Sequence, residues 1–248
     1  MRIVGLGLVA LAALWAVAPA RAETVRVLCS QGLKTVVESL GPTYEAETGD
    51  RLAIDYDTSV QLKAQVDAGK PFDVVVLTPP LIADLIARGK VADGSSVTLA
   101  RAGGAIAVRA GAPHPDISTD AAFARTLTHA ASVAYSTTGA SNGVLMKALD
   151  TLGITDQVKA KGRTVPNGLT GALVARGEAE LAVQLMPELM STPGVELVGP
   201  FPPGLQSYVL LTAGLSATLT DRTPAARFLA YLGTPAARTV IREKGLEP

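Results

Sequence analysis

Small polar and glycine-rich clusters stand at four points where an apolar, strand-like run ends and a helix-like pattern begins. The first half of the chain has Ser30-Gln31-Gly32 and Thr58-Ser59, and the second half has Gly139-Ala140-Ser141-Asn142 and Asn167-Gly168-Leu169-Thr170-Gly171. A helix start carries unpaired backbone N–H groups and a partial positive charge, and hydroxyls and glycines there let an anion approach these donors. Two such junctions in each half of the chain predict a cleft that binds an oxyanion or a carboxylate.

The hydroxyl groups at these junctions also have a simpler explanation. Each could be an ordinary N-cap, which stabilises a helix by about 1 kcal/mol; the residues concerned are Ser30, Thr58, Ser59, Ser141 and Thr170. Gln184 ends a predicted strand, and its amide could donate to a carboxylate or face solvent. Arg101 and Arg163 could supply a guanidinium fork for a carboxylate or lie on the surface.

The chain offers few other reactive groups. One cysteine excludes an internal disulfide, and its place in an apolar run predicts a core residue rather than a reactive thiol. Two histidines, His114 and His129, have no metal-ligand spacing, so we expect no metal site and no cofactor. Asp55 and Asp57 alternate along a strand and therefore do not pair, and no Ser–His–Asp or Cys–His order is visible.

The first 22 residues are typical of a secretory leader. Arg2 precedes an apolar run over residues 3–17, and Ala20-Arg21-Ala22 is a small-x-small cleavage site. The predicted mature chain of 226 residues carries a net charge of about −2, which gives no bulk attraction to nucleic acid or to an acidic membrane. We therefore expect a periplasmic, monomeric protein whose partner is a small anion held by local geometry.

Short β-rich runs alternate with helical patterns, which is typical of an α/β fold with parallel strands. The predicted strands are 25–29, 52–56, 72–77, 105–109, 132–135, 163–165, 180–184 and 208–212, and the predicted helices are 33–48, 60–68, 81–88, 121–127, 144–152, 170–176, 224–232 and 235–244. The late strand and the closing helices pack best on the first block. This predicts a discontinuous lobe one (23–103 and 209–248), an inserted lobe two (104–208), and a two-strand hinge between them.

Five stretches resemble one known family in their order and spacing. They are Ser30–Leu33, TGDRLAIDYDTSVQL (48–62), PFDVVVL (71–77), LVARGEAELAV (173–183) and the C-terminal stretch 225–245. Together they resemble type II periplasmic solute-binding proteins, and most closely the molybdate-binding family of ABC transporters. The resemblance covers essentially the whole mature chain. It implies two lobes, each a mostly parallel sheet flanked by helices, that close on an oxyanion held by hydrogen bonds alone.

The resemblance also implies a set of contact residues. Serines at the first two helix starts match Ser30 and Ser59, with Gln31 and Thr58 as close competitors. Backbone amides in lobe two match the neighbourhood of Ala140 or Ser141 and of Gly168 to Thr170. Gly139 and Asn142 belong to the same lobe-two loop and are included in the predicted site, as is Gln184.

Two departures from the family pattern favour a ligand other than molybdate. The segment Val183-Gln184-Leu185-Met186-Pro187 lacks the tyrosine usual in molybdate binders, and the loop 136–143 replaces an Asp-Pro loop with hydroxyl and amide donors. These changes point to a small di- or tricarboxylate. Aconitate isomerase resembles the same family, so an isomerase of an unsaturated tricarboxylate stands beside the transport receptor as an alternative, although the sequence shows no obvious catalytic base.

Overall fold

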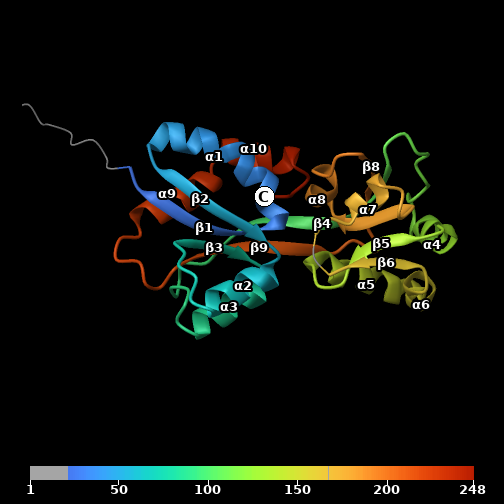
Figure 1. The fold of residues 1–248 in the computed structure, drawn as a ribbon, viewed down its shortest axis with the longest axis horizontal. Coiled ribbons are helices and arrows are strands. Elements are labelled where there is room, and N and C mark those ends of the chain that lie inside the picture. The colour runs from blue at the N-terminus through green and yellow to red at the C-terminus, as the bar shows by residue number, and fades with distance from the viewer. Residues whose placement is uncertain (1–21, 167) are drawn as a thin grey trace, which may run out of the picture.

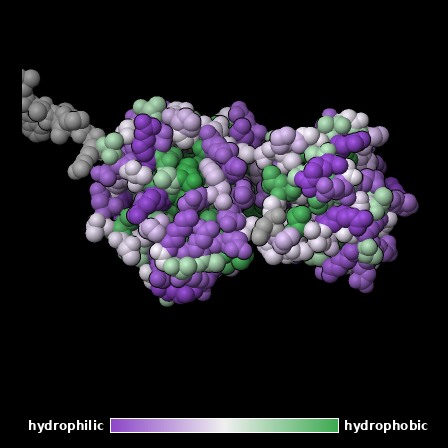
Figure 2. Space-filling view, in the orientation of Figure 1, coloured by the Kyte–Doolittle hydropathy of each residue, from purple (hydrophilic) through white to green (hydrophobic). Residues whose placement is uncertain are grey.

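The computed structural model describes residues 22–166 and 168–248. The predicted leader lies outside these residues except for Ala22, and so does Asn167 of the fourth junction. Two masses of sheet and helix are joined by strands that run between them (Figure 1), and a constriction separates the two masses in the space-filling view (Figure 2). No helix within the described ranges is long and apolar enough to span a membrane.

The predicted strands and helices are all present. The strands are β1 (Thr24–Ser30), β2 (Arg51–Asp57), β3 (Val74–Leu77), β4 (Val97–Arg109), β5 (Val133–Ser136), β6 (Gly162–Val165), β7 (Leu181–Leu185), β8 (Val195–Pro200) and β9 (Tyr208–Leu215). The helices are the 3-10 turn η1 (Gln31–Leu33), α1 (Lys34–Thr48), α2 (Ser59–Asp67), α3 (Pro79–Ala87), α4 (Asp120–His129), α5 (Ala140–Leu152), α6 (Thr155–Lys159), α7 (Gly171–Ala175), α8 (Met186–Met190), α9 (Thr223–Leu232) and α10 (Pro235–Glu243). The sequence patterns did not predict α6, α8 and β8, which are all short.

The sheet of the first mass runs in the order β2-β1-β3-β9-β4. Strands β2, β1 and β3 are parallel, as their βαβ spacing predicts, whereas β9 returns antiparallel between β3 and β4. Helix α1 packs with α9 and α10 on one face, and α2 and α3 cover the other, where Leu62 and Leu85 are fully buried (Figure 1). Parallel strands buried on both faces are expected to be almost wholly apolar, and β3 is.

Strand β4 connects the two masses because it changes partners along its length. Residues from Val97 to Gly103 pair with β9, and residues from Gly104 to Arg109 pair with β7 and β8. At the change, the Gln206 side chain takes the place of a strand neighbour. Its Oε1 accepts from the Gly104 amide at 2.9 Å, and its Nε2 donates to the Gly104 carbonyl at 3.0 Å. We therefore propose the division into lobe one (23–103 and 209–248) and lobe two (104–208).

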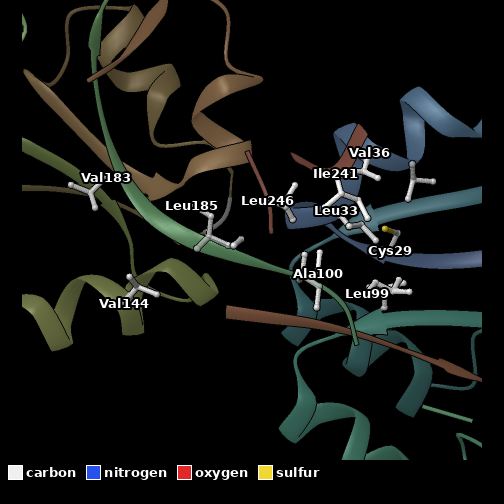
Figure 3. Packing of buried hydrophobic residues seen from close by; sticks show 14 of the residues in the cluster. Cys29, Leu33, Val36, Leu99, Ala100, Val144, Val183, Leu185, Ile241 and Leu246 are labelled. Atoms are coloured by element: carbon white, nitrogen blue, oxygen red, sulfur yellow. The ribbon is translucent and has the colours of Figure 1, made fainter. Parts of the chain in front are cut away.

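Lobe two repeats the layered plan of lobe one. Strands β7, β5 and β6 are parallel neighbours, and β4 joins them antiparallel. Helices α4, α5 and α6 lie on one face, with α7 and α8 on the other (Figure 1). The main apolar core runs from lobe one into lobe two, and Figure 3 shows Leu185 of lobe two across from Leu33 and Leu246 of lobe one.

Two carboxylates fix the strands at the end of lobe one away from the junction clusters. Asp73, which enters β3, accepts from the Arg26 amide at 2.7 Å and from the Arg26 guanidinium at 2.6 Å and 3.1 Å. This long-range pair ties β3 to β1. The Asp50 carboxylate is buried and accepts hydrogen bonds from the Tyr44 hydroxyl and the Arg227 guanidinium. These bonds tie α1 to α9.

Candidate functional site

The lobe-one part of the candidate site forms where β1 and β2 end. The parallel register places Ser30 opposite Asp57, so the two following helix starts lie side by side. The Ser59 hydroxyl donates to the Ser30 hydroxyl at 3.1 Å, and both residues are buried. Strand pairing therefore brings together two serines that are 29 residues apart in the sequence, and their hydroxyls lie within hydrogen-bond distance of each other.

Of the three hydroxyl residues at these two helix starts, Thr58 caps a helix, whereas Ser30 and Ser59 do not. The Thr58 side chain accepts from the Gln61 amide at 3.3 Å and is the N-cap of α2. Ser59 follows it as the first residue of the helix. Ser30 precedes η1 but makes no side-chain capping bond there. Ser30 and Ser59 are thus buried hydroxyls without a capping role, while Gln31 stands beside them, partly exposed, as the first residue of η1.

The first lobe-two loop joins β5 to α5. Gly139 is the N-cap of α5, and its amide donates to the Ser136 hydroxyl at 2.8 Å. A Cβ at this position would lie 2.8 Å from the Ser136 Oγ, so only glycine fits this close approach. Ala140 is exposed, Ser141 is buried and Asn142 is intermediate. The loop therefore presents the start of a long helix whose N-cap amide is held by Ser136, a contact that the sequence pattern did not predict.

The second lobe-two loop joins β6 to α7 and lies next to the first. The Thr138 hydroxyl donates to the Pro166 carbonyl, and the Thr137 amide donates to the Val165 carbonyl at 3.1 Å. Gly168 has a φ of +103°, which favours glycine. Thr170 is fully buried. Because β5 and β6 are parallel neighbours, the loops after them meet at the same edge of the sheet, as the four-junction pattern predicts.

Gln184 holds this second loop in place. Its Oε1 accepts from the Thr170 amide at 2.8 Å and from the Thr170 hydroxyl at 2.9 Å, and its Nε2 donates to the Gly168 carbonyl at 3.4 Å. The side chain is buried. Neither of the two roles weighed for Gln184, a donor to the ligand or a solvent-facing residue, describes these contacts. Any effect of Gln184 on a ligand would pass through the loop.

The two lobes touch beside the serine pair. A Cβ on Gly32 would lie 3.7 Å from Leu185 of lobe two and 3.4 Å from Leu211 of β9. Helix α8 packs on η1, and Met186 and Met190 of α8 pack on Gly245. Since Leu185 ends β7 and Gly32 follows β1, the carboxyl ends of the parallel strands in both lobes face this contact. The four junctions are thereby brought to the boundary between the lobes.

The remaining candidate residues lie elsewhere. Arg101 binds Glu247 and stacks on the Tyr208 ring at 4.3 Å, and Arg163 lies exposed on β6. His114 pairs with Glu196, and His129 bonds the Arg125 carbonyl. Within the described ranges, no group of three His, Cys, Asp or Glu side chains is arranged to hold a metal ion.

One acidic residue near the site was missed altogether. Glu188 of α8 accepts from the Leu185 amide at 3.3 Å. Burial of its carboxyl group raises the pKa to about 7, although the bonds from the Leu185 amide and the Gln184 side chain lower it. A glutamate three residues after a strand end, beside a proline, is a capping pattern that could have revealed both Glu188 and α8.

Comparison with known proteins agrees with this architecture. The chain is 35% identical over 232 residues to an aconitate isomerase from Pseudomonas sp., which covers 91% of this chain and 88% of that protein. The periplasmic molybdate-binding protein of Azotobacter vinelandii superposes with a TM-score of 0.75 at 19% identity, over 90% of this chain and 99% of that one.

A sulfate-binding protein from Mycobacterium tuberculosis superposes with a TM-score of 0.73 at 16% identity, over 91% of this chain and 87% of that one. At these identities the structural likenesses show the fold alone. The family described as bacterial extracellular solute-binding protein matches residues 25–247, which is nearly the whole described chain. The chain therefore belongs to the bacterial extracellular solute-binding proteins.

Proposed function

We propose that this protein captures a small organic anion with several carboxylate groups between its two lobes and presents it to an ABC permease. The observation that carries the proposal is the buried Ser30–Ser59 hydroxyl pair, which stands at two adjacent helix starts and caps neither helix. Two hydroxyls freed from capping can turn toward an anion and donate to it. Their mutual hydrogen bond at 3.1 Å is then exchanged for two bonds to the ligand.

Lobe two supplies the opposing donors in this proposal from Ala140 and Ser141 at the start of α5 and from Gly168 and Leu169 in the second loop, because the Gly139 amide already donates to Ser136 and both donors of Thr170 already bind Gln184. The start of α5 at Gly139 to Asn142 and the loop at Gly168 to Thr170 meet at one edge of the sheet and face the lobe boundary. The predicted site residues carry no positive charge, so the ligand is held by neutral donors and by the dipole of α5. Closure of the lobes then excludes water and strengthens each of these bonds.

The carboxylate class rests on two supports. The relative at 35% identity is named for aconitate, a small unsaturated tricarboxylate. The end of β7 also reads Gln184-Leu185 and lacks the tyrosine that is usual in molybdate binders. The leader and the family point to the periplasm, where a single mature chain would act as a monomer.

An isomerase of aconitate is the second candidate, and the 35% identity over 91% of the chain favours it. An allylic proton shift breaks a C–H bond next to a carboxylate and needs a base of suitable pKa. The pKa of Glu188, raised by burial to about 7, suits that task. In this structure, however, its carboxylate accepts from the Leu185 amide at the start of α8, so the binding function is better supported.

A thermal-shift screen of the mature protein tests the proposal. Cis-aconitate, trans-aconitate, citrate and simple dicarboxylates should raise the melting midpoint by mass action, and molybdate, tungstate and sulfate should not. A shift with molybdate alone would refute the carboxylate class. An ultraviolet assay of cis- and trans-aconitate interconversion then separates receptor from isomerase, because turnover without added cofactor is expected only of the second.

Ser30→Ala combined with Ser59→Ala should abolish most of the ligand-induced shift. Each serine that donates to an anion contributes about 1.5–3 kcal/mol, which corresponds to at least a hundredfold in affinity for the pair. Thr234→Ala is the matched control, because it removes the N-cap of α10 at the opposite end of that helix from the turn that contacts α8. It should lower stability by about 1 kcal/mol and leave affinity intact. Unchanged affinity in the double serine variant would refute the site.

A further inference from the structure

The segment that follows α10 lies at the boundary between the two lobes. The C-terminal end of the chain stands where the two masses meet, beside α8 (Figure 1). Helix α10 ends at Glu243, and Gly245 then turns the chain with a φ of +81°. Gly245, Leu246 and Glu247 each contact a different part of the molecule. We call these three residues the strap.

The end of the strap at Glu247 is fixed to the strand that connects the lobes. The Arg101 amide of β4 donates to the Glu247 carbonyl at 2.7 Å, and the Glu247 amide donates to the Arg101 carbonyl at 2.9 Å, which makes an antiparallel bridge. The Arg101 Nε also donates to the Glu247 carboxylate at 2.7 Å. Leu246 is buried in the main apolar core (Figure 3). Backbone bonds and burial therefore hold this end in place.

This attachment lies beside both crossings of the chain between the lobes. Arg101 comes shortly before Gly104, where β4 exchanges β9 for β7 and β8 as its partners. Strand β9 pairs with one edge of β4 at this point, so Glu247 occupies the other edge. The Arg101 guanidinium also stacks on the ring of Tyr208, which begins β9 after the second crossing, at 4.3 Å. The strap is therefore anchored on the lobe-one side of the hinge.

The other end of the strap contacts lobe two through thioethers alone. A Cβ on Gly245 would lie 2.6 Å from the Met190 Sδ and 3.0 Å from the Met186 Cγ. Both methionines belong to α8, and Met190 is 49% exposed. In the part of the chain that the structure describes, no hydrogen bond or ion pair joins residues 244–248 to α8. Methionine side chains adapt to changed surroundings, so this contact can shift or break without leaving a polar group unpaired.

We propose that the strap holds α8 against lobe one and thereby sets how often the two lobes leave the arrangement seen in this structure. The strap moves with lobe one because its backbone is bonded to β4, whereas α8 moves with lobe two. A rotation of the lobes about the crossing at Gly104 must therefore shift or separate Gly245 from the two methionines. This contact favours the present arrangement whether or not a ligand is bound.

The distance between the lobes in the ligand-free mature protein tests the proposal. Spin labels at two exposed positions, Glu47→Cys on α1 and Gln157→Cys on α6, report this distance by double electron–electron resonance, and Cys29 is fully buried and stays unlabelled. Met186→Ala combined with Met190→Ala should lower the share of the distance seen in the parent protein and raise the share of a second distance.

Met146→Ala is the matched control, because it truncates a methionine of lobe two on α5, on the face of the sheet opposite α8. This variant should keep the distance distribution of the parent protein. If the double methionine variant also keeps that distribution, the strap does not hold the lobes and the proposal is wrong.

Removal of residues 245–248 tests whether the strap acts through the two methionines. The shortened protein should show the same redistribution, and the two methionine substitutions should add nothing to it, because the contact is already lost. Effects that add would overturn the proposal. If the shortened protein does not fold, the methionine variant still decides. Since no ligand is used, failure of the carboxylate function leaves this test unaffected.

Discussion

The partly buried side chain of Glu188 predicts a specific dependence of stability on pH. Its pKa is about 7 in the folded protein, against an ordinary value of 4.5. A folded pKa above the unfolded one means that the folded state holds the proton more tightly, so this contribution to stability is fully present below about pH 4.5 and is lost as the pH rises through 7. A shift of this size corresponds to about 3 kcal/mol.

Glu188→Gln isolates this contribution because glutamine is isosteric with the protonated acid and can still accept from Leu185. The variant and the parent should have similar free energies of unfolding near pH 4.5. By about pH 8 the variant should be the more stable by about 3 kcal/mol, or roughly 6–12 °C in melting midpoint for a chain of this length. Urea denaturation across the pH range gives the difference, in which the titration of other groups cancels.

Glu178→Gln is the control for a general effect of removing negative charge from lobe two. The pKa of Glu178 is lowered by its hydrogen bond with Arg176, which is the opposite sign. This variant should therefore gain no stability as the pH rises. If the difference between Glu188→Gln and the parent protein stays constant from about pH 4.5 to 8, the carboxyl group is hydrated and the reasoning from burial is refuted.

Two further predictions concern the scaffold. Asp73→Asn should lower the free energy of unfolding by about 2 kcal/mol, because the Arg26 guanidinium loses its charged partner while the Arg26 amide keeps an acceptor; an unchanged urea midpoint would contradict this. Gly104→Ala should cost about 1–3 kcal/mol, since its Cβ would lie 2.7 Å from Val144 and 3.0 Å from Phe201. The control Gly143→Ala, inside α5 with open space around it, should raise stability by up to about 1 kcal/mol. A stable Gly104→Ala protein would show that β4 can shift at the crossing point.

Local signals predicted the regular elements well where a long apolar pattern had a clear stop. The glycines at 49, 69 and 89 follow the ends of α1, α2 and α3 with positive φ, a conformation that favours glycine and ends a helix. The pattern failed for α6 and α8, each of which has five residues. So short a helix shows little of a 3.6-residue period, and packing is needed to stabilise it. The equally short α7 was predicted because it follows one of the four polar junctions.

The roles of the hydroxyl groups could not be predicted in the same way. Thr58 and Ser59 are adjacent, equally able to cap a helix, and the sequence does not distinguish them. In the folded chain Thr58 caps α2, and Ser59 turns to Ser30. Gln184 was expected near the ligand because it ends a predicted strand. In the folded chain its side-chain oxygen instead accepts a hydrogen bond from Thr170, 14 residues earlier. Such pairings depend on which loops meet, and that is decided by strand order.

The sequence by itself determined the α/β alternation, the order of the elements and the four polar junctions, because these depend on contacts within a few residues along the chain. Tertiary structure decided which junctions converge. The parallel register brought Ser30 to Ser59, the change of partners along β4 at Gly104 placed one lobe against the other, and burial set the pKa of Glu188. Burial and convergence depend on groups far apart in the chain, so no local pattern encodes them.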